Sequence, residues 1–113
     1  KNQENIAIGI GYGAKDSITD IKTLAEKTGA ALSATRKMVD NDYLPYDIQV
    51  GLTGKSVSPD VYIALGISGA VHHIAGMRQS GTVIAVNTDS QAPIFKYSDY
   101  GIVADINEIL SLL

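Results

Sequence analysis

Five short apolar runs alternate with segments of helical periodicity, and this alternation constrains the fold more than any other feature of the sequence. The runs are rich in Val, Ile and Ala and lack the polar alternation of a strand with one wet face. Because parallel strands need crossover connections and are covered on both sides, the pattern predicts an α/β fold with a parallel five-stranded sheet and helices on both faces. The expected strands are residues 5–11, 30–34, 61–65, 82–86 and 101–104.

Two amphipathic helices have recognisable ends. The first follows Ser17, which can cap it together with Asp20, and Gly29 supplies the stop. The last follows Asp105, with Glu108 at the third helical position of a capping box. Shorter helical segments are expected at residues 37–40 and at residues 70–75, before Gly76.

Length and charge exclude several classes of protein. The 113 residues suit one domain, residues 1–113. The net charge is -3 and no basic cluster exceeds the pair Arg36–Lys37, so the electrostatic attraction that drives binding to nucleic acid is missing. No apolar run is long enough to insert into a membrane and no targeting segment is seen. The absence of cysteine excludes disulfides and thiolate metal sites. These features fit a cytoplasmic protein of the bacterial type.

Polar and glycine-rich turns follow the expected strands. In a parallel sheet, ligands bind beyond the carboxyl ends of the strands, so these turns are the candidate site. The turn at residues 66–69 leads into a helix, and its backbone N–H groups with the positive helix end favour an anion such as the phosphate of a cofactor. The candidate turns are residues 11–13, 35–36, 66–69, 87 and 105.

Three familiar motifs fail when their spacing is counted. Residues 54–56 (Gly-Lys-Ser) lack the earlier glycine of a P-loop, because residue 49 is Gln. Residues 9–14 match G-x-G-x-x-A, but no acidic residue closes the second strand to bind a ribose, which leaves a weak dinucleotide fingerprint. Residues 66–70 would form a nucleophile elbow only with glycine at position 70, which is Ala. A hydrolase that uses Ser68 is therefore the lowest-ranked hypothesis.

A set of ordered motifs extends over nearly the whole chain. They are Thr35–Arg36, residues 49–55 (QVGLTGK), residues 59–70 (PDVYIALGISGA), residues 73–77 (HIAGM), residues 85–87 (AVN), residues 92–95 (APIF) and residues 99–105 (DYGIVAD). Together these motifs resemble the FAD-binding, C-terminal domain of the electron transfer flavoprotein alpha subunit. The resemblance implies a Rossmann-like sheet of the DHS-like NAD/FAD-binding type. It also implies an electron carrier without substrate turnover of its own. Such a carrier would pair with a beta subunit and take electrons from acyl-CoA or related dehydrogenases.

The resemblance also assigns roles to residues. It implies that Arg36 lies against the flavin ring, that Thr53 bonds near N5 and that His73 donates to O2. It implies that Ser68 and the following residues line the phosphate path, and that Asn87, Asp105 and Ile106 hold the adenosine end. The residues expected at FAD are Tyr12, Thr35, Arg36, Gln49, Val50, Gly51, Leu52, Thr53, Gly54, Ser68, Gly69, Ala70, Val71, His72, His73, Asn87, Asp105 and Ile106.

Several positions depart from the family pattern. Where the family commonly has Gly-Arg-Gly after the first strand, this chain has Tyr12, which is expected to remove a cation near the cofactor. Leu52 and His72 each stand where Gln is usual, and Thr88 stands where Lys is common. The N-terminal domain of the family's alpha subunit is also absent from this sequence. An alternative is therefore a vestigial or partner-binding domain of the same fold that does not retain FAD alone.

Overall fold

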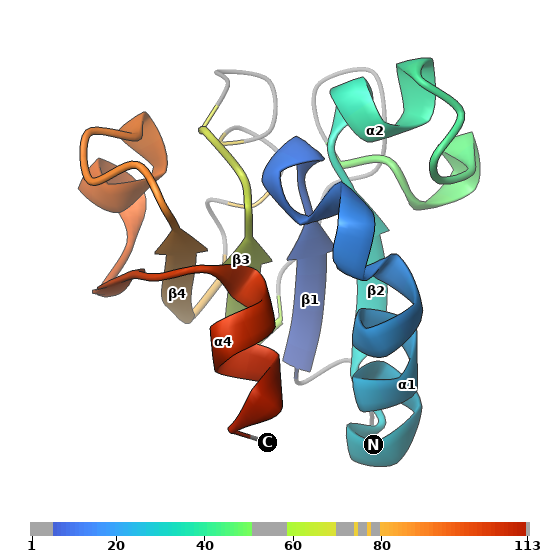
Figure 1. Ribbon diagram of the computed structural model, residues 1–113, viewed down its shortest axis with the longest axis horizontal. Coiled ribbons are helices and arrows are strands. Elements are labelled where there is room, and N and C mark those ends of the chain that lie inside the picture. The colour runs from blue at the N-terminus through green and yellow to red at the C-terminus, as the bar shows by residue number, and fades with distance from the viewer. Residues whose placement is uncertain (1–5, 51–58, 70–73, 75–76, 78–79, 113) are drawn as a thin grey trace.

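The computed structural model describes residues 6–50, 59–69, 74, 77 and 80–112, and its centre is one five-stranded sheet. All four strand pairs are parallel and the spatial order is β2-β1-β3-β4-β5 (Figure 1). This confirms the expected α/β architecture. The strands are β1 (Ile6–Ile10), β2 (Ala31–Ala34), β3 (Val61–Leu65), β4 (Thr82–Asn87) and β5 (Tyr100–Val103).

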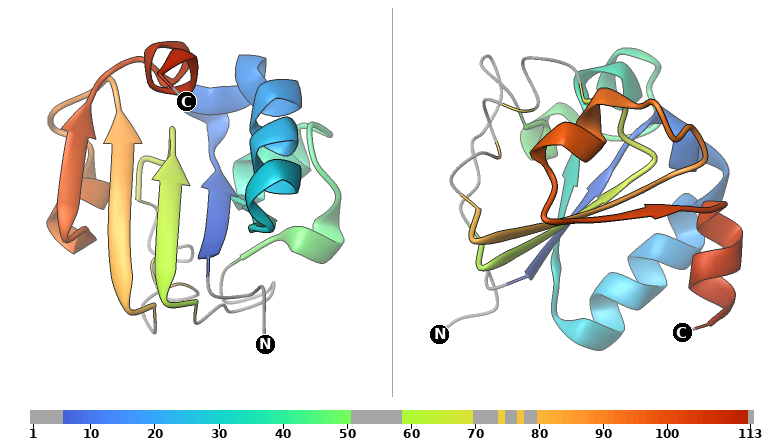
Figure 2. Two further views of the ribbon diagram at one scale, coloured as in Figure 1. Left: turned by 90° about the horizontal axis from the view of Figure 1, so that it is seen from below. Right: turned by 90° about the vertical axis from the view of Figure 1, so that its left-hand side faces the viewer.

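Two apolar clusters occupy the two faces of the sheet, because successive side chains of a strand point to opposite sides. Ile8 and Ile10 of β1 belong to the cluster under α1 (Ile18–Thr28) and α4 (Ile106–Ser111). Ala7 belongs to the cluster on the other face, which the 3₁₀ helix η4 (Pro93–Tyr97) and the helical residue Met77 help to cover. The right-hand view of Figure 2 shows the sheet nearly edge-on, with α1 and α4 on one side of it.

The predicted helix ends are partly confirmed. Gly29 ends α1 with a left-handed φ of 76°, which glycine adopts at low cost. Ser17 precedes α1 but makes no side-chain cap, so that part of the prediction is wrong. Its hydroxyl instead donates to Oδ1 of Asn107 at 2.7 Å and joins α1 to α4. The physical reason is that the 3₁₀ helix η2 (Tyr12–Ser17) leads directly into α1, so the chain enters the helix already turning.

The helix expected at residues 70–75 falls mostly outside the described residues. Ile74 and Met77 are both helical, and Met77 lies beyond the expected end. The short helix expected at 37–40 is present as α2 (Arg36–Asp40), and a 3₁₀ helix, η3 (Tyr46–Ile48), interrupts the loop that follows it. Gln49 then pairs with Ala34 in a parallel bridge, so the chain returns to the outer edge of β2.

Gly9 has a packing role. The side chain of Tyr62, fully buried in β3, lies over Gly9 of β1 and reaches Ser33 of β2, where the two hydroxyls are 2.9 Å apart. A Cβ at Gly9 would lie 2.0 Å from the Tyr62 hydroxyl oxygen. The first glycine of the G-x-G-x-x-A pattern is therefore explained by Tyr62, which agrees with the weakness of the dinucleotide fingerprint.

Candidate functional site

Several of the described candidate residues lie along one edge of the sheet, where the arrowheads of Figure 1 end. The strand order sets their sequence along that edge: Thr35–Arg36 follow β2, Tyr12 lies beyond β1, Ser68–Gly69 beyond β3, Asn87 ends β4 and Asp105 lies beyond β5. Neighbouring strands are about 4.8 Å apart, so the four intervals of this row span about 19 Å. The turns therefore form an extended row rather than a single compact pocket.

The turns after β1 and β3 are locked together by their main chains. The N–H of Gly11 donates to the Leu65 carbonyl at 2.9 Å, and the N–H of Gly13 donates to the Gly66 carbonyl at 3.0 Å. A Cβ at Gly11 would lie 2.4 Å from the Gly66 carbonyl oxygen, so only glycine permits this approach. Ligands of open α/β sheets bind where the strand order reverses, which is between β1 and β3 in this chain. Because main chain fills that crevice, a ligand at this edge would lie over the two turns.

The turn at Ser68 and Gly69 is held in place by the backbone of Ile94 in η4. The Ser68 carbonyl accepts the Ile94 N–H at 2.8 Å, and Gly69 has a φ of 104° with the backbone of Ile94 directly beside it. The Ser68 residue is exposed. An exposed serine on a fixed turn is suited to bind an anionic oxygen, as the sequence led us to expect.

Thr35 carries the one buried side-chain polar atom without a hydrogen-bond partner among the described residues, its Oγ1. The residue precedes α2 but makes no side-chain cap to that helix. Its backbone N–H donates to the Ile10 carbonyl at 3.2 Å, which fixes the residue at the carboxyl ends of β1 and β2. Leaving a buried hydroxyl without a partner costs free energy, so this atom is suited to a ligand.

Arg36 is exposed, with 64% of its side chain accessible. Its Nε lies 3.3 Å from an oxygen of Asp40, one helical turn further on in α2. An exposed pair of this kind contributes little to stability, so the guanidinium can be drawn to another anion at low cost. The structure therefore leaves Arg36 available at the β2 end of the row.

Tyr12 is the centre of a small aromatic and cationic cluster. The Nζ of Lys37 lies 4.2 Å from the centroid of its ring, and the Nζ of Lys15 lies 5.3 Å from it. The ring of Tyr43 packs against it edge-on, with centroids 6.2 Å apart and an angle of 74°. A hydrogen bond from Lys15 to Asp16 raises the pKa of Lys15 above its ordinary value, which keeps that amine charged.

The cluster changes the expectation for position 12. Tyrosine there was expected to remove one cation near the cofactor, whereas two ammonium groups gather at its ring. Sequence reasoning noted Lys37 only as half of a basic pair, since a pattern does not give the direction in which a lysine side chain points. The signal was the combination of an aromatic residue after the first strand and a lysine after the second.

The β4 and β5 end of the row is held by side-chain hydrogen bonds. Asn87 donates to the Ile67 carbonyl at 3.1 Å and accepts the Asp89 N–H at 2.9 Å, so its amide links the β3 and β4 turns. Asp105 forms the predicted capping box of α4, with its carboxylate 2.8 Å from the Asn107 N–H. The Ile106 side chain is buried, which leaves its backbone to contact a ligand.

Gln49 and Val50 are also buried beside β2, so any contact from them to a ligand would come through the backbone or through rearrangement. The remaining candidates lie outside the described residues. These are Gly51, Leu52, Thr53, Gly54, Ala70, Val71, His72 and His73.

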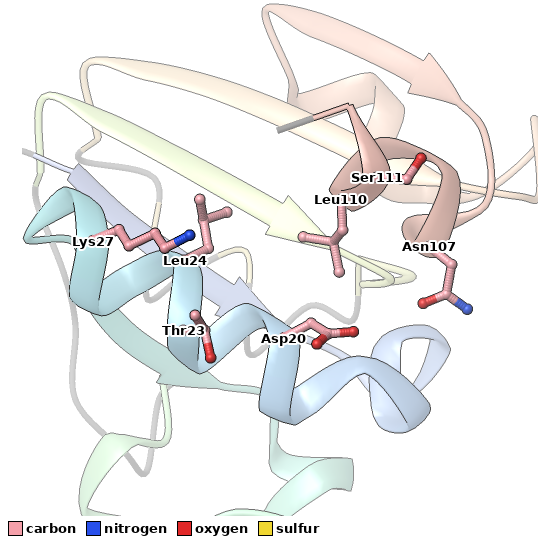
Figure 3. Close-up of a pocket in the computed structure, with 7 residues that line it drawn as sticks. All are labelled: Asp20, Thr23, Leu24, Lys27, Asn107, Leu110 and Ser111. Atoms are coloured by element: carbon pink, nitrogen blue, oxygen red, sulfur yellow. The ribbon is translucent and has the colours of Figure 1, made fainter.

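Two hollows lie away from this row. An open cavity of about 440 Å³ separates α1 from α4, and Figure 3 shows the side chains that line it, including Asp20, Lys27 and Asn107. A second cavity of about 170 Å³ lies beneath these helices and is lined only by apolar residues, among them Leu24 and Ile106. Apart from the buried Ile106, neither of these two hollows includes a candidate residue.

In residues 6–50, 59–69, 74, 77 and 80–112, no three His, Asp or Glu side chains gather to hold a metal ion. Over the same residues, no helix combines the length and the apolar character needed to cross a membrane.

Relatives of known name match most of the chain. It is 50% identical over 102 residues to an electron transfer flavoprotein subunit alpha of Paracoccus denitrificans, covering 90% of this chain and 33% of the relative. It is 49% identical over 108 residues to the protein of that name from Bacillus subtilis strain 168, covering 96% of this chain and 33% of the relative. The mitochondrial subunit alpha of Oryza sativa subsp. indica is 50% identical, with 93% of this chain and 29% of the relative covered. The chain thus spans about a third of the length of these relatives.

Among solved structures, a putative phosphosugar isomerase from Silicibacter pomeroyi DSS-3 aligns with a TM-score of 0.47 and 18% identity, over 88% of this chain and 30% of that chain. That likeness is too slight to bear on function. The sequence profile of the electron transfer flavoprotein FAD-binding domain matches residues 2–78, which is more than half of the chain. Together with the identity of about half to subunit alpha relatives, this match shows that the chain belongs to the electron transfer flavoprotein FAD-binding domain family.

Proposed function

We propose that the chain is an electron carrier domain that binds FAD in an extended form along the carboxyl edge of its sheet. In this proposal the isoalloxazine ring lies at Thr35–Arg36, the diphosphate lies over Ser68–Gly69, and the adenosine lies at Asn87 and Asp105. FAD supplies, when bound, a ring that accepts and releases electrons. The protein binds and orients it, and tunes the charge around it.

One observation carries the proposal. The family resemblance assigns Arg36 to the ring, Ser68 to the diphosphate and Asp105 to the adenosine, without reference to the strand order. The sheet arranges their strands as β2, β3 and β5 along one edge, in the order in which these parts occur along FAD. A different strand order would have scattered the three roles, so the agreement supports a single extended ligand.

The residues present fit the group. The buried Oγ1 of Thr35 has no partner among the described residues, and a ligand atom at the β2 end would supply one. Arg36 beside it holds a permanent positive charge, which stabilises the negative charge that reduction adds to the ring. An exposed ion pair with Asp40, 3.3 Å away, reduces this charge only in part.

The wider role extends beyond the described chain. We propose that residues 1–113 form one domain of a longer protein that pairs with an electron transfer flavoprotein beta subunit. The pair would accept electrons from acyl-CoA or related dehydrogenases and pass them to a redox partner, with no substrate turnover of its own. The subunit alpha relatives support this role. A cytoplasmic location stays a prediction from the sequence.

The test is the absorbance spectrum of the full-length protein, purified with its beta-type subunit and then titrated with FAD. We expect flavin absorbance at one FAD per pair. A complex that assembles but binds no flavin would instead support the vestigial or partner-binding domain. That alternative is motivated by the departures at Tyr12, Leu52 and Thr88.

A further inference from the structure

We propose that Lys37, held by the ring of Tyr12, binds the diphosphate of FAD. This inference rests on the proposed function and adds to it a binding residue outside the positions that the resemblance assigns to FAD. The cation that the family carries at position 12 would in this chain come from the neighbouring strand end.

The first support is the balance of charge at the β1 and β2 ends. Lys15 lies 3.3 Å from a carboxylate oxygen of Asp16, and Arg36 lies 3.3 Å from one of Asp40. Each of these cations is therefore partly neutralised. Among the described residues, no carboxylate forms an ion pair with Lys37. Within residues 6–50, 59–69, 74, 77 and 80–112, Lys37 is thus the cation at the β1 and β2 ends that no carboxylate pairs with.

The second support is that the Lys37 side chain has a defined direction. An exposed lysine usually extends into water, whereas the Nζ of Lys37 lies 4.2 Å from the centroid of the Tyr12 ring. At that distance the face of the ring attracts the ammonium group. Tyr43 packs edge-on against the same ring and supports its orientation. The lysine side chain is therefore partly ordered before any ligand binds, so it has less conformational entropy to lose on binding.

The third support is position. Lys37 belongs to α2 after β2, but its ammonium group reaches the turn after β1. Gly13, next to Tyr12, is hydrogen-bonded to Gly66, which begins the turn of Ser68. The ammonium group therefore lies on the side of the row that leads from the ring end towards the proposed diphosphate position. The diphosphate is the charged part of oxidised FAD, and lysine binds phosphate as a point charge.

The experiment compares FAD and ADP, because ADP keeps the diphosphate and lacks the isoalloxazine ring. Dissociation constants are measured on the full-length protein with its beta-type subunit. We expect Lys37→Gln to raise both constants about tenfold, as for the loss of one charge-assisted contact. Lys22→Gln is the matched control, because Lys22 is exposed on α1, and it should change neither constant by more than about twofold.

Variants of Tyr12 test the positioning role. Tyr12→Leu removes the ring and should weaken FAD binding, whereas Tyr12→Phe keeps a ring under the ammonium group and should recover most of that loss. The double variant Tyr12→Leu/Lys37→Gln should be no weaker than Lys37→Gln alone, because both changes remove one interaction. If Tyr12→Leu fails to fold, Lys37→Gln and Tyr12→Phe still decide the question.

Two results with the Lys37→Gln variant would overturn the inference while leaving the proposed function intact. Either Lys37→Gln binds FAD as tightly as the wild type, or it weakens FAD but not ADP, which would assign the ammonium group to the ring. A wild-type complex that binds neither ligand would overturn the proposed function together with this inference. Wild-type binding with an unaffected Lys37→Gln variant would overturn the inference alone.

Discussion

The hydroxyl of Tyr62 lies 2.9 Å from the hydroxyl of Ser33, and the two residues belong to strands that are separated by β1. The tyrosine side chain crosses β1 at Gly9, the position where no side chain intervenes. This contact joins three adjacent strands on one face of the sheet, and it leads to the first two predictions.

Gly9→Ala should destabilise the protein by about 3 kcal/mol, because the new methyl group would meet the Tyr62 ring in a packed core. Gly29→Ala is the comparison, since nothing lies within 4 Å of a Cβ there and only the left-handed φ is penalised. That variant should lose about 1 kcal/mol. Urea unfolding measures both losses of unfolding free energy, provided that the dependence of that free energy on urea concentration is the same in each variant. Equal losses would contradict the packing role of Gly9.

Stability above pH 10 should depend on Tyr62. Burial raises the pKa of this phenol well above its ordinary value of 10.0, and the Ser33 hydrogen bond lowers it only in part. The folded state thus favours the neutral phenol, so its contribution to stability is full below pH 10 and declines as the pH rises towards the folded pKa. The wild type should lose about 1.4 kcal/mol per pH unit more than Tyr62→Phe in that range. Tyr97→Phe, at an exposed position, should keep the wild-type slope.

Thr35→Val should separate folding from ligand binding. Removing a buried hydroxyl that lacks a partner among the described residues should stabilise the ligand-free protein by about 1 kcal/mol. The same change should weaken FAD binding about fivefold, because the proposed ligand contact is lost. Thr35→Ser keeps the hydroxyl and serves as the control. Thermal unfolding without FAD and a flavin titration measure the two effects, and unchanged FAD affinity would exclude Thr35 from the site.

Arg36→Gln should lower the reduction potential of the bound flavin by about 30 mV. This shift corresponds to a change of roughly threefold in the equilibrium constant of a one-electron reduction. The reason is the loss of a positive charge that favours the reduced ring. Asp40→Asn should leave the potential unchanged or raise it, since it frees the guanidinium from its partner at 3.3 Å. Spectroelectrochemical titration of the folded variants measures both, and an Arg36→Gln potential at or above that of the wild type would exclude the charge role.

Asp105 should have two separable roles, one in the stability of α4 and one in the binding of FAD. Asp105→Ala removes the capping box of α4 and should cost about 1 kcal/mol in unfolding free energy. Asp105→Asn keeps an oxygen that can accept the Asn107 N–H, so most of that stability should remain. Both variants should weaken FAD binding, because the carboxylate is lost from the adenosine end. If the Asn variant binds FAD normally, Asp105 acts as a helix cap alone.

The strands were predictable because a buried parallel strand appears in the sequence as a short apolar run between turn residues. The residues at strand ends followed from the same reasoning, since parallel strands share one carboxyl edge. The strand order was not predicted, because a sequence does not show on which side of β1 the next strand lies. The order places Arg36, Ser68 and Asp105 beyond β2, β3 and β5 along one edge, and this arrangement supports the proposed extended position of FAD.

Side-chain direction was the other limit. Serine is a common helix-capping residue, yet the hydroxyl of Ser17 donates its hydrogen bond to Asn107, a residue 90 positions away. Lys37 had the appearance of a surface charge, yet it lies on the ring of Tyr12. Both outcomes depend on which segments the fold brings together, and a local sequence pattern does not predict contacts between distant segments.

The locked turns after β1 and β3 bear on how this edge can change during evolution. Gly11, Gly13 and Gly66 join through backbone atoms, so the platform under the proposed ligand does not depend on which side chains surround it. Mutations at neighbouring positions can then alter the charge presented to a cofactor with little penalty to folding. In this chain the Nζ of Lys37, from the adjacent strand end, lies 4.2 Å from the centroid of the Tyr12 ring, so positive charge is brought to this edge without any part in the backbone platform.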